Sequence, residues 1–129
     1  MAVRHEQKAV EEGPSASEAA ALEQERRMLY CLSQVPSLGA VSIQELGEFF
    51  GGFSNLFNIE ETALRESGIL REGQIQALCG AKKNLTKHLE DYERLAERGI
   101  WFVTPLDKEY PERLRHIHGY PMGLYVRGK

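Results

Sequence analysis

Positive charge is missing from the middle of this 129-residue chain, where no lysine or arginine occurs between Arg27 and Arg65. Residues 29–68 carry one basic and five acidic side chains, which gives a net charge of −4. The formal net charge of the whole chain is −3, which argues against a protein that binds nucleic acid over its entire surface. Positive charge accumulates only towards the end, because residues 100–129 hold five basic and three acidic side chains.

Cysteine and long apolar runs are scarce as well. Cys31 and Cys79 lie far apart in the sequence, which excludes a disulfide framework and gives no metal-ligand spacing. We expect two buried, reduced thiols in a cytoplasmic protein. No stretch approaches the roughly 18 apolar residues that a membrane span needs, and the first residues lack the apolar region of a signal peptide. With 42% apolar residues, the chain can fill the core of a domain of ordinary size.

Motifs of catalysis and nucleotide binding are also missing. The sequence has no Gly-x-Ser-x-Gly, no Cys–His signature, no Gly-x-Gly-x-x-Gly and no Walker loop. His116 and His118 are separated by one residue and have no cysteine nearby, so we interpret them as surface or packing residues. We therefore expect no catalytic residue, no metal site and no cofactor in this chain.

The first part of the chain has the apolar spacing of short helices. Residues 1–16 are polar and contain a Gly-Pro-Ser breaker, which predicts a flexible tail. Ser17 is predicted to cap a helix that runs to about Gln34. Ser42 is predicted to cap the next helix, in a capping box with Glu45, and two glycines at 51–52 end it.

Further helices are predicted up to residue 99. Residues 53–66 predict two short helical turns, which Gly68 interrupts. From about Glu72, apolar side chains at three- and four-residue steps predict one long helix that reaches Arg98. Gly99 then has the place of a left-handed residue after a helix end. We therefore predict a helical domain over residues 17–99.

The last thirty residues combine two dense apolar runs with a short connection. Residues 100–103 predict a strand buried on both faces, a proline then opens a short helix, and residues 124–126 predict a second strand. Strand, helix and strand in this order are typical of the start of an α/β sheet, and we expect the two strands to belong to a parallel sheet. Two strands cannot close a core, so we expect residues 100–129 to be the incomplete start of an α/β domain.

The same segment carries a spaced motif. Asp-x-x-Tyr-Pro-x-x-Leu-x-x-Ile is followed by Tyr-Pro-x-x-Leu-Tyr-Val-Arg-Gly. It resembles the beginning of the Rossmann-like domain of the DNA-processing protein A family (DprA, also called Smf). The matching positions are Asp107, Tyr110, Pro111, Leu114, Ile117, Pro121, Leu124, Tyr125, Arg127 and Gly128. The resemblance extends more weakly back to about Leu29.

The resemblance implies a fold and a function. The fold would be a small SAM-like helical bundle followed by the start of a Rossmann-like α/β domain. The function would be that of a bacterial recombination mediator, which binds single-stranded DNA and loads the RecA recombinase onto it during natural transformation, in cells competent for DNA uptake. The full-length protein would form a homodimer. Members of the family bind DNA chiefly through a Gly-Ser-Arg phosphate loop and a basic pocket, which are expected downstream of this sequence.

A few residues of this chain are candidates for DNA contact. Arg113, Arg115, Arg127 and Lys129 are the best candidates for a phosphate-facing surface, since the last two lie at the end of a predicted strand. A salt bridge to a carboxylate is an equally good interpretation of each arginine. We interpret the three lysines at positions 82, 83 and 87 as a solvated helix surface.

Two loops between helices resemble helix-hairpin-helix units, at Val35–Ala40 and, in degenerate form, at Ser67–Gly73. Gly39 would let backbone N–H groups at a helix N-terminus approach a phosphate. Ser37 stands where such a motif often has glycine, and two glutamates follow the first loop. This favours a tight turn between helices over a DNA contact, and a protein as the partner of the helical domain.

Three functions remain open from the sequence. The preferred one is the N-terminal part of a DprA-like recombination mediator. The second is a helical protein–protein interaction module that does not bind DNA. The third is the N-terminal part of a Rossmann-like nucleotide-processing enzyme whose active site lies downstream.

Overall fold

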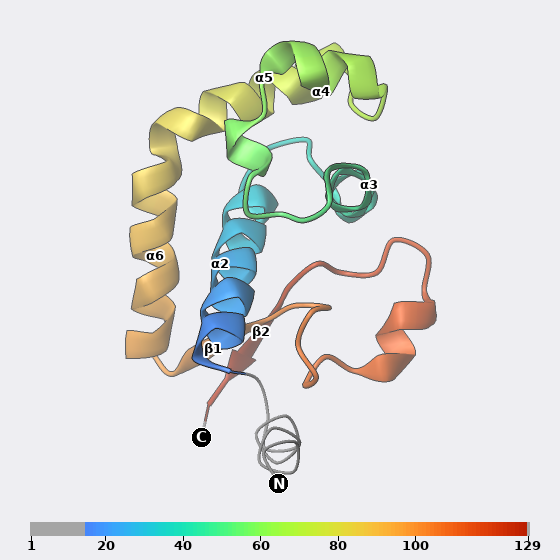
Figure 1. Cartoon of the computed structure of the whole chain (residues 1–129). Coiled ribbons are helices and arrows are strands. Elements are labelled where there is room, and N and C mark those ends of the chain that lie inside the picture. Colours follow the sequence, from blue (N-terminus) through green and yellow to red (C-terminus); the bar gives the residue numbers. More distant parts are fainter. Residues whose placement is uncertain (1–14, 129) are drawn as a thin grey trace, which may run out of the picture.

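The computed structural model describes residues 15–128, and these residues form a helical bundle with a small two-stranded sheet at one end (Figure 1). This confirms the prediction of a mainly α chain that continues into the start of an α/β arrangement. No helix of the described part has the length and apolar character needed to cross a membrane. The elements, where η denotes a short 3₁₀ helix, are α2 (Ala16–Ser33), α3 (Ala40–Phe50), η1 (Leu56–Asn58), α4 (Glu61–Ser67), α5 (Glu72–Ala81), η2 (Lys82–Asn84), α6 (Leu85–Glu97), β1 (Ile100–Val103), η3 (Glu112–His116) and β2 (Leu124–Arg127).

The N-terminal caps of the first two helices differ from the predictions. Helix α2 is capped by Ser15 and not by Ser17, because Glu18 lies three residues after Ser15 and completes a capping box. The Glu18 N–H donates to Ser15 Oγ at 3.2 Å, and the Ser15 N–H donates to the Glu18 carboxylate at 2.8 Å. The predicted tail at residues 1–16 therefore overlaps this helix at Ala16 and includes its N-cap Ser15, while residues 1–14 lie outside the described residues.

Helix α3 begins three residues earlier than predicted. Its N-cap is Gly39, and Ser42 lies inside the first turn, so the predicted capping box of Ser42 and Glu45 does not form. The Ser42 hydroxyl instead accepts a hydrogen bond from the side-chain amide of Gln74, at 3.4 Å. A tertiary contact with the start of α5 thus replaces the local cap. The predicted end of the helix is confirmed, since Gly51 takes a left-handed conformation with φ of 80°.

The single long helix predicted from Glu72 to Arg98 is wrong, because η2 divides it into α5 and α6. Figure 1 shows the two helices running in clearly different directions. The bend lets two apolar stripes pack separately. Ile75 and Leu78 of α5 are buried in the core, whereas Tyr92 of α6 packs its ring 5.4 Å from that of Tyr30 on α2. Burial of both stripes thus outweighs the local preference for a continuous helix.

The turn between α2 and α3 holds Ser37 in a left-handed conformation, with φ of 66°. Ser37 is the only non-glycine residue of the described part with positive φ. Its Cβ carries a steric cost in this region that glycine does not have.

We predict that Ser37→Gly stabilises the protein by about 0.5 kcal/mol, since relief of this strain exceeds the extra entropy of glycine in the unfolded chain. Urea unfolding followed by circular dichroism measures the change. Gly68→Ala is the matched control of opposite sign, because Gly68 has a φ of 72°. A Ser37→Gly variant less stable than the parent protein would contradict this account of the turn.

Strands β1 and β2 are antiparallel, so the expected parallel pair is wrong. Ile100 lies opposite Arg127, and Val103 lies opposite Leu124. The connection contains only the five-residue η3 and no crossover helix, so the chain turns back beside the strand that it left. The expected burial on both faces is also wrong. Phe102 is 5% exposed, whereas its neighbour Trp101 is 60% exposed. A run of four apolar residues has no alternation from which the covered face could be read.

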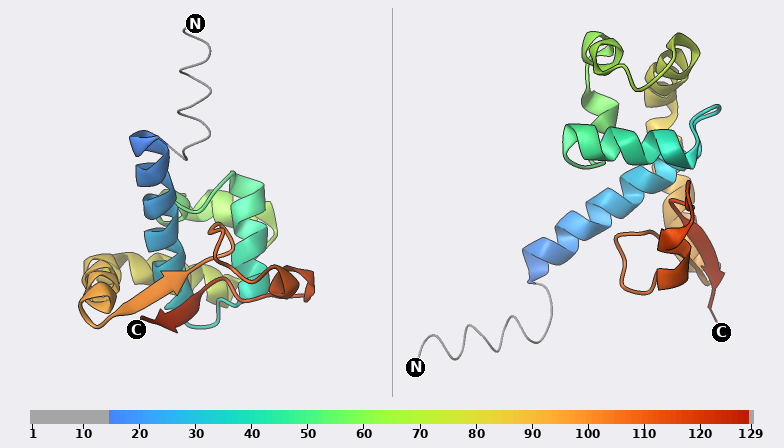
Figure 2. Two further views of the ribbon diagram at one scale, coloured as in Figure 1. Left: turned by 90° about the horizontal axis from the view of Figure 1, so that it is seen from below. Right: turned by 90° about the vertical axis from the view of Figure 1, so that its right-hand side faces the viewer.

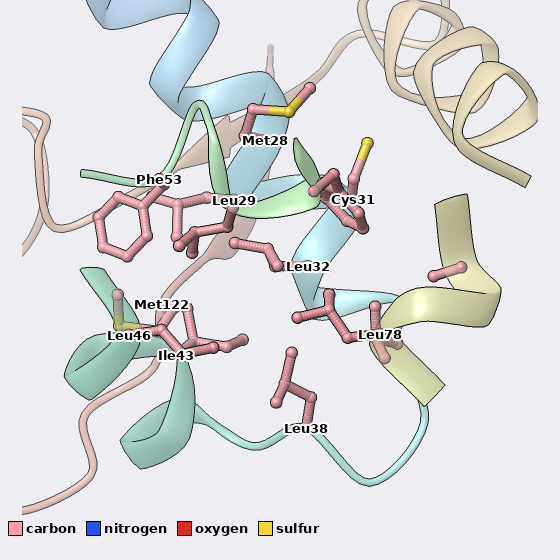
Figure 3. Packing of buried hydrophobic residues seen from close by; sticks show 14 of the residues in the cluster. Met28, Leu29, Cys31, Leu32, Leu38, Ile43, Leu46, Phe53, Leu78 and Met122 are labelled. Carbon is pink, nitrogen blue, oxygen red and sulfur yellow. The ribbon is translucent and has the colours of Figure 1, made fainter. Parts of the chain in front are cut away.

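One hydrophobic cluster joins the helices to the sheet segment. Figure 3 shows Met122, from the loop before β2, beside Leu46 and Ile43 of α3. At the other end of the bundle, the Phe102 ring meets Tyr30 edge-on, at 5.3 Å between centroids. The predicted boundary between the domains at residues 17–99 and 100–129 coincides with the end of α6 and the left-handed Gly99. The separation into two domains stays a prediction.

Candidate functional site

The motif segment after β1 is organised around the buried carboxylate of Asp107. Asp107 is 6% exposed, and its Oδ2 accepts hydrogen bonds from the Thr104 N–H at 2.8 Å and from the Thr104 hydroxyl at 3.0 Å. Arg26 of α2 donates to both carboxylate oxygens, with its Nε 3.4 Å from Oδ2. Burial opposes ionisation of Asp107, but the hydrogen bonds from Arg26 and Thr104 outweigh it and hold its pKa below the usual range. The first residue of the motif therefore fastens this loop to α2.

The two Tyr-Pro pairs of the motif are fastened to each other. The Tyr110 hydroxyl donates to the carbonyl oxygen of Pro121 at 2.6 Å, and the Tyr110 ring is almost fully buried. Arg115 lies over this ring at 5.1 Å and donates to the carbonyl oxygen of Asp107 at 3.3 Å. The two Tyr-Pro pairs of the motif therefore hold the two ends of one loop together.

The predicted DNA-contacting residues fall in two separate places. Arg113 and Arg115 lie on η3, and the loop that follows η3 reaches α3, because a Cβ placed on Gly119 would be only 3.2 Å from the Val41 side chain. Figures 1 and 2 show η3 and α3 on the side of the molecule away from α6. Gly39, at the N-terminus of α3, therefore lies on the same side as η3. Arg127 lies at the far end of β2, opposite Ile100.

The surroundings of these residues differ. Arg115 is engaged by Tyr110, by the Asp107 carbonyl and by Glu112, whose carboxylate is 3.2 Å from its Nε. Arg113 and Arg127 are exposed, and in the part of the chain that the structure describes neither takes part in an ion pair. Lys129 lies outside the described residues. Arg113 and Arg127 therefore keep the charge that a phosphate contact needs.

Both predicted hairpins are tight turns between helices. In the first, the Ser37 carbonyl accepts the side-chain amide of Gln74 at 2.9 Å, which ties the turn to the start of α5. Gly39 provides no side-chain cap for α3. In the second hairpin, Arg65 bridges α4 and α5 through ion pairs with Glu61 and Glu72. Hydrogen bonds from Arg65 and Gln76 lower the pKa of Glu72 to about 2.

The remaining polar candidates lie on the surface. Lys82 and Lys83 on η2 and Lys87 on α6 are exposed, and so are His116 and His118. His116 lies 3.9 Å from Glu112. Within residues 15–128, no three histidine, cysteine or acidic side chains gather in a way that could hold a metal ion.

A groove of about 890 Å³ runs along β1, and no sequence pattern predicts it. Its lining combines β1 with the middle of α2, at Glu23, Arg26 and Arg27, and with the C-terminal half of α6. Arg27 of α2 closes one end through an ion pair with Glu93 of α6 at 2.8 Å. The rest of the lining is mostly apolar, from residues that include Tyr92, Leu95, Ala96, Ile100, Trp101, Phe102, Val103 and Val126. The groove borders a predicted DNA contact on η3, because Asp107 in its lining accepts a hydrogen bond from Arg115 at 3.3 Å.

The backbone of β1 is paired on one edge only. Gly128 donates its N–H to the carbonyl oxygen of Gly99, so the hydrogen-bonded positions of the ladder alternate from there to Trp101 and Val103. The N–H and C=O groups of Ile100 and Phe102 consequently face away from β2. This open edge is a place where another strand could add.

The chain is similar to the protein Smf of a Synechocystis species, with 29% identity over 99 residues. The match covers 75% of this chain, and the chain spans about a quarter of the length of Smf, 24%. No family model matches the chain, and no solved structure matches it significantly. The similarity to Smf supports the resemblance to the DprA/Smf family of DNA-processing proteins that the motif predicted.

Proposed function

We propose that this chain is the N-terminal part of a DNA-processing recombination mediator, which binds single-stranded DNA and assists the loading of RecA in natural transformation. The similarity to Smf carries the proposal, because it extends over most of the chain. The structure of the motif adds support, since Asp107, Tyr110 and Pro121 hold one loop together. Single-strand binding, the contact with RecA, homodimer formation and a cytoplasmic location are proposed for the whole mediator. The role proposed is that of a binding protein and not of an enzyme.

Within the mediator, we propose that residues 100–129 begin the sheet of a Rossmann-like domain. The open edge of β1 and the exposed apolar face of Trp101 and Val126 support this, because both are costly to leave in water. The face that carries Phe102 is already covered by α2 and α6. The helical residues 17–99 then form a separate surface for contacts with proteins.

Because single-strand binding is proposed for the whole mediator and protein contacts for the helical residues, we predict that this chain alone binds single-stranded DNA weakly. The two exposed arginines, Arg113 and Arg127, lie apart, and the hairpin at Gly39 is followed by uncompensated acidic residues. We expect a dissociation constant weaker than about 10 μM for a fluorescein-labelled oligothymidine at 0.15 M salt, in the range of nonspecific binding.

Fluorescence anisotropy measures this affinity. Arg113→Ala and Arg127→Ala should each weaken what binding exists and lower its salt dependence, whereas Lys83→Ala on η2 should leave it unchanged. Tight binding that persists when both arginines are replaced by alanine would show that other residues of this chain contact the DNA.

A helical interaction module without DNA binding is the second candidate function, and one observation favours it. The first hairpin, α3 and η1 all lie in the stretch that has no lysine or arginine between Arg27 and Arg65. Such a surface repels a phosphate backbone and suits a protein.

A further inference from the structure

We infer that the outer face of α3 is a docking surface for a cationic amphipathic helix of a protein partner. The α3 outer face consists of Val41, Glu45, Glu48 and Phe49. This inference deepens the proposed role of the helical part in protein contacts and rests on it.

The α3 outer face follows from helical spacing. Positions 41, 45, 48 and 49 are four, three and one apart, so they share one side of the helix, while Ile43 and Leu46 point into the core. Val41 is 38% exposed and Phe49 is 61% exposed. Figure 1 shows α3 end-on at the edge of the molecule, with one side turned away from all other elements. Two apolar side chains therefore flank two carboxylates on a largely exposed helix face, which the loop at Gly119 borders at Val41.

Phe49 has the features of a preorganised anchor. Its ring packs edge-on against Phe50, with 4.8 Å between the centroids and 74° between the planes. Phe50 is half-buried and packs against the hydrophobic core, so it holds its neighbour in place. A large aromatic side chain that is already ordered loses little entropy when a partner covers it.

The negative charge of the α3 outer face favours a positively charged partner. Among residues 15–128, neither Glu45 nor Glu48 forms an ion pair, and Glu48 only accepts a hydrogen bond from Gln44 at 3.3 Å. The stretch of sequence that contains α3 has no lysine or arginine between Arg27 and Arg65. Two carboxylates beside an exposed phenylalanine are complementary to basic side chains that flank an apolar stripe.

The same charges disfavour other occupants. A second copy docked face to face would bring the like-charged glutamates together, which is unfavourable. Nucleic acid and anionic lipid surfaces would be repelled by the same two carboxylates. A helix with lysines on its polar face and leucines on its apolar face meets both features of α3 at once.

The test uses a 15-residue Leu/Lys amphipathic peptide as the probe, titrated into the isotope-labelled protein and followed by NMR chemical shifts. The largest shifts are expected at residues 41–49. Phe49→Ala should weaken binding about tenfold, the effect typical of a lost aromatic anchor. The double variant Glu45→Gln, Glu48→Gln should weaken binding and flatten its dependence on salt. The variants should fold normally because the replaced side chains are exposed.

Matched controls come from other surfaces of the chain. Ile117→Ala removes an apolar side chain that is 54% exposed at the C-terminal end of η3, and Glu66→Gln removes an exposed carboxylate on α4. Both should bind the peptide within about twofold of the parent protein, as expected for residues outside an interface. A peptide of the same length with glutamate in place of lysine should not bind.

Three results would overturn the inference. Peptide-induced shifts centred on another surface would reject the α3 outer face but keep a protein-contact role for the helical part. No binding of the cationic peptide at all would reject the protein-contact role as well. Shifts at α3 on addition of oligothymidine, or a dimer that forms through α3, would replace the proposed partner by nucleic acid or by a second copy.

Discussion

Asp107→Asn is expected to destabilise the protein by about 3 kcal/mol, because it leaves a partly buried guanidinium and a buried N–H without their anionic acceptor. The side chains of Arg26 and Asp107 are only 22% and 7% exposed. An asparagine of the same shape would turn an N–H₂ group towards the donors of Arg26 and Thr104. The change is measured as the free energy of unfolding in urea at pH 7.

The matched control is Asp91→Asn, which removes the same charge from an exposed ion pair with Arg94 at 3.2 Å. Its cost should stay below about 0.5 kcal/mol, as for other surface ion pairs. Equal costs for the two variants would show that Asp107 does not fasten the motif loop to α2.

The dependence on pH gives a second readout of the same carboxylate. Because the folded-state pKa of Asp107 lies below its unfolded value of about 3.9, its ionisation stabilises the protein at higher pH, and this contribution is lost as the pH falls through the folded-state pKa. Below about pH 4 the parent protein should therefore lose stability more steeply than Asp107→Asn, so the difference between them narrows. If the free energies of unfolding of the two proteins changed in parallel with pH, this result would contradict the ion pair between Arg26 and Asp107.

Phe102→Ala is expected to cost about 4 kcal/mol, in the range found for a fully buried phenylalanine. The Phe102 ring meets Tyr30, Tyr92 and Tyr125 at centroid distances of 5.3, 6.4 and 5.3 Å. Its loss would leave a cavity where β1 joins α2 and α6. Thermal unfolding should show one transition in both proteins, shifted to lower temperature in the variant.

Trp101→Ala is the control, one residue earlier on the same strand but on the other face. Trp101 is 60% exposed, so its removal should cost less than about 1 kcal/mol. In the Phe102→Ala variant, the sheet segment could instead unfold in a separate transition at lower temperature while the helices stay folded. That result would show that the sheet and the bundle do not share a core.

Local chemistry in the sequence was enough to predict most helix ends. Gly51, Gly68 and Gly99 were predicted breakers, and each takes a positive φ directly after a helix. Glycine has no Cβ to penalise this conformation, so its effect needs no knowledge of the rest of the fold. The same holds for the proline before η3.

Features that depend on distant contacts were not predictable. The hydrogen bonds of Arg26 to Asp107 join residues 81 positions apart, and no pattern in either neighbourhood indicates them. The bend at η2 exists because two apolar stripes pack against different partners. The antiparallel pairing of β1 and β2 depends on how the motif loop folds back, which its own hydrogen bonds decide.

For the candidate site, the residue types were predicted but their arrangement was not. Arg113 and Arg115 are neighbours in sequence, yet only Arg113 keeps an exposed, unpaired charge within the described part, because Arg115 packs on Tyr110. Nothing in the sequence separates the two. The α3 outer face had a sequence signal, namely acidic and apolar residues at helical spacing without basic neighbours. Its exposure became visible only once Ile43 and Leu46 were placed in the core.

The central proposal is that β1 and β2 begin a larger sheet, which helices cover on the Phe102 face and which is bare on the Trp101 face. Acrylamide quenching of tryptophan fluorescence in a monomeric sample tests it most directly, because Trp101 is the one tryptophan of the chain. The account predicts red-shifted emission that acrylamide quenches almost as readily as a free indole. Blue-shifted emission that is protected from acrylamide in the monomer would mean that this face is already covered, and would contradict the claim.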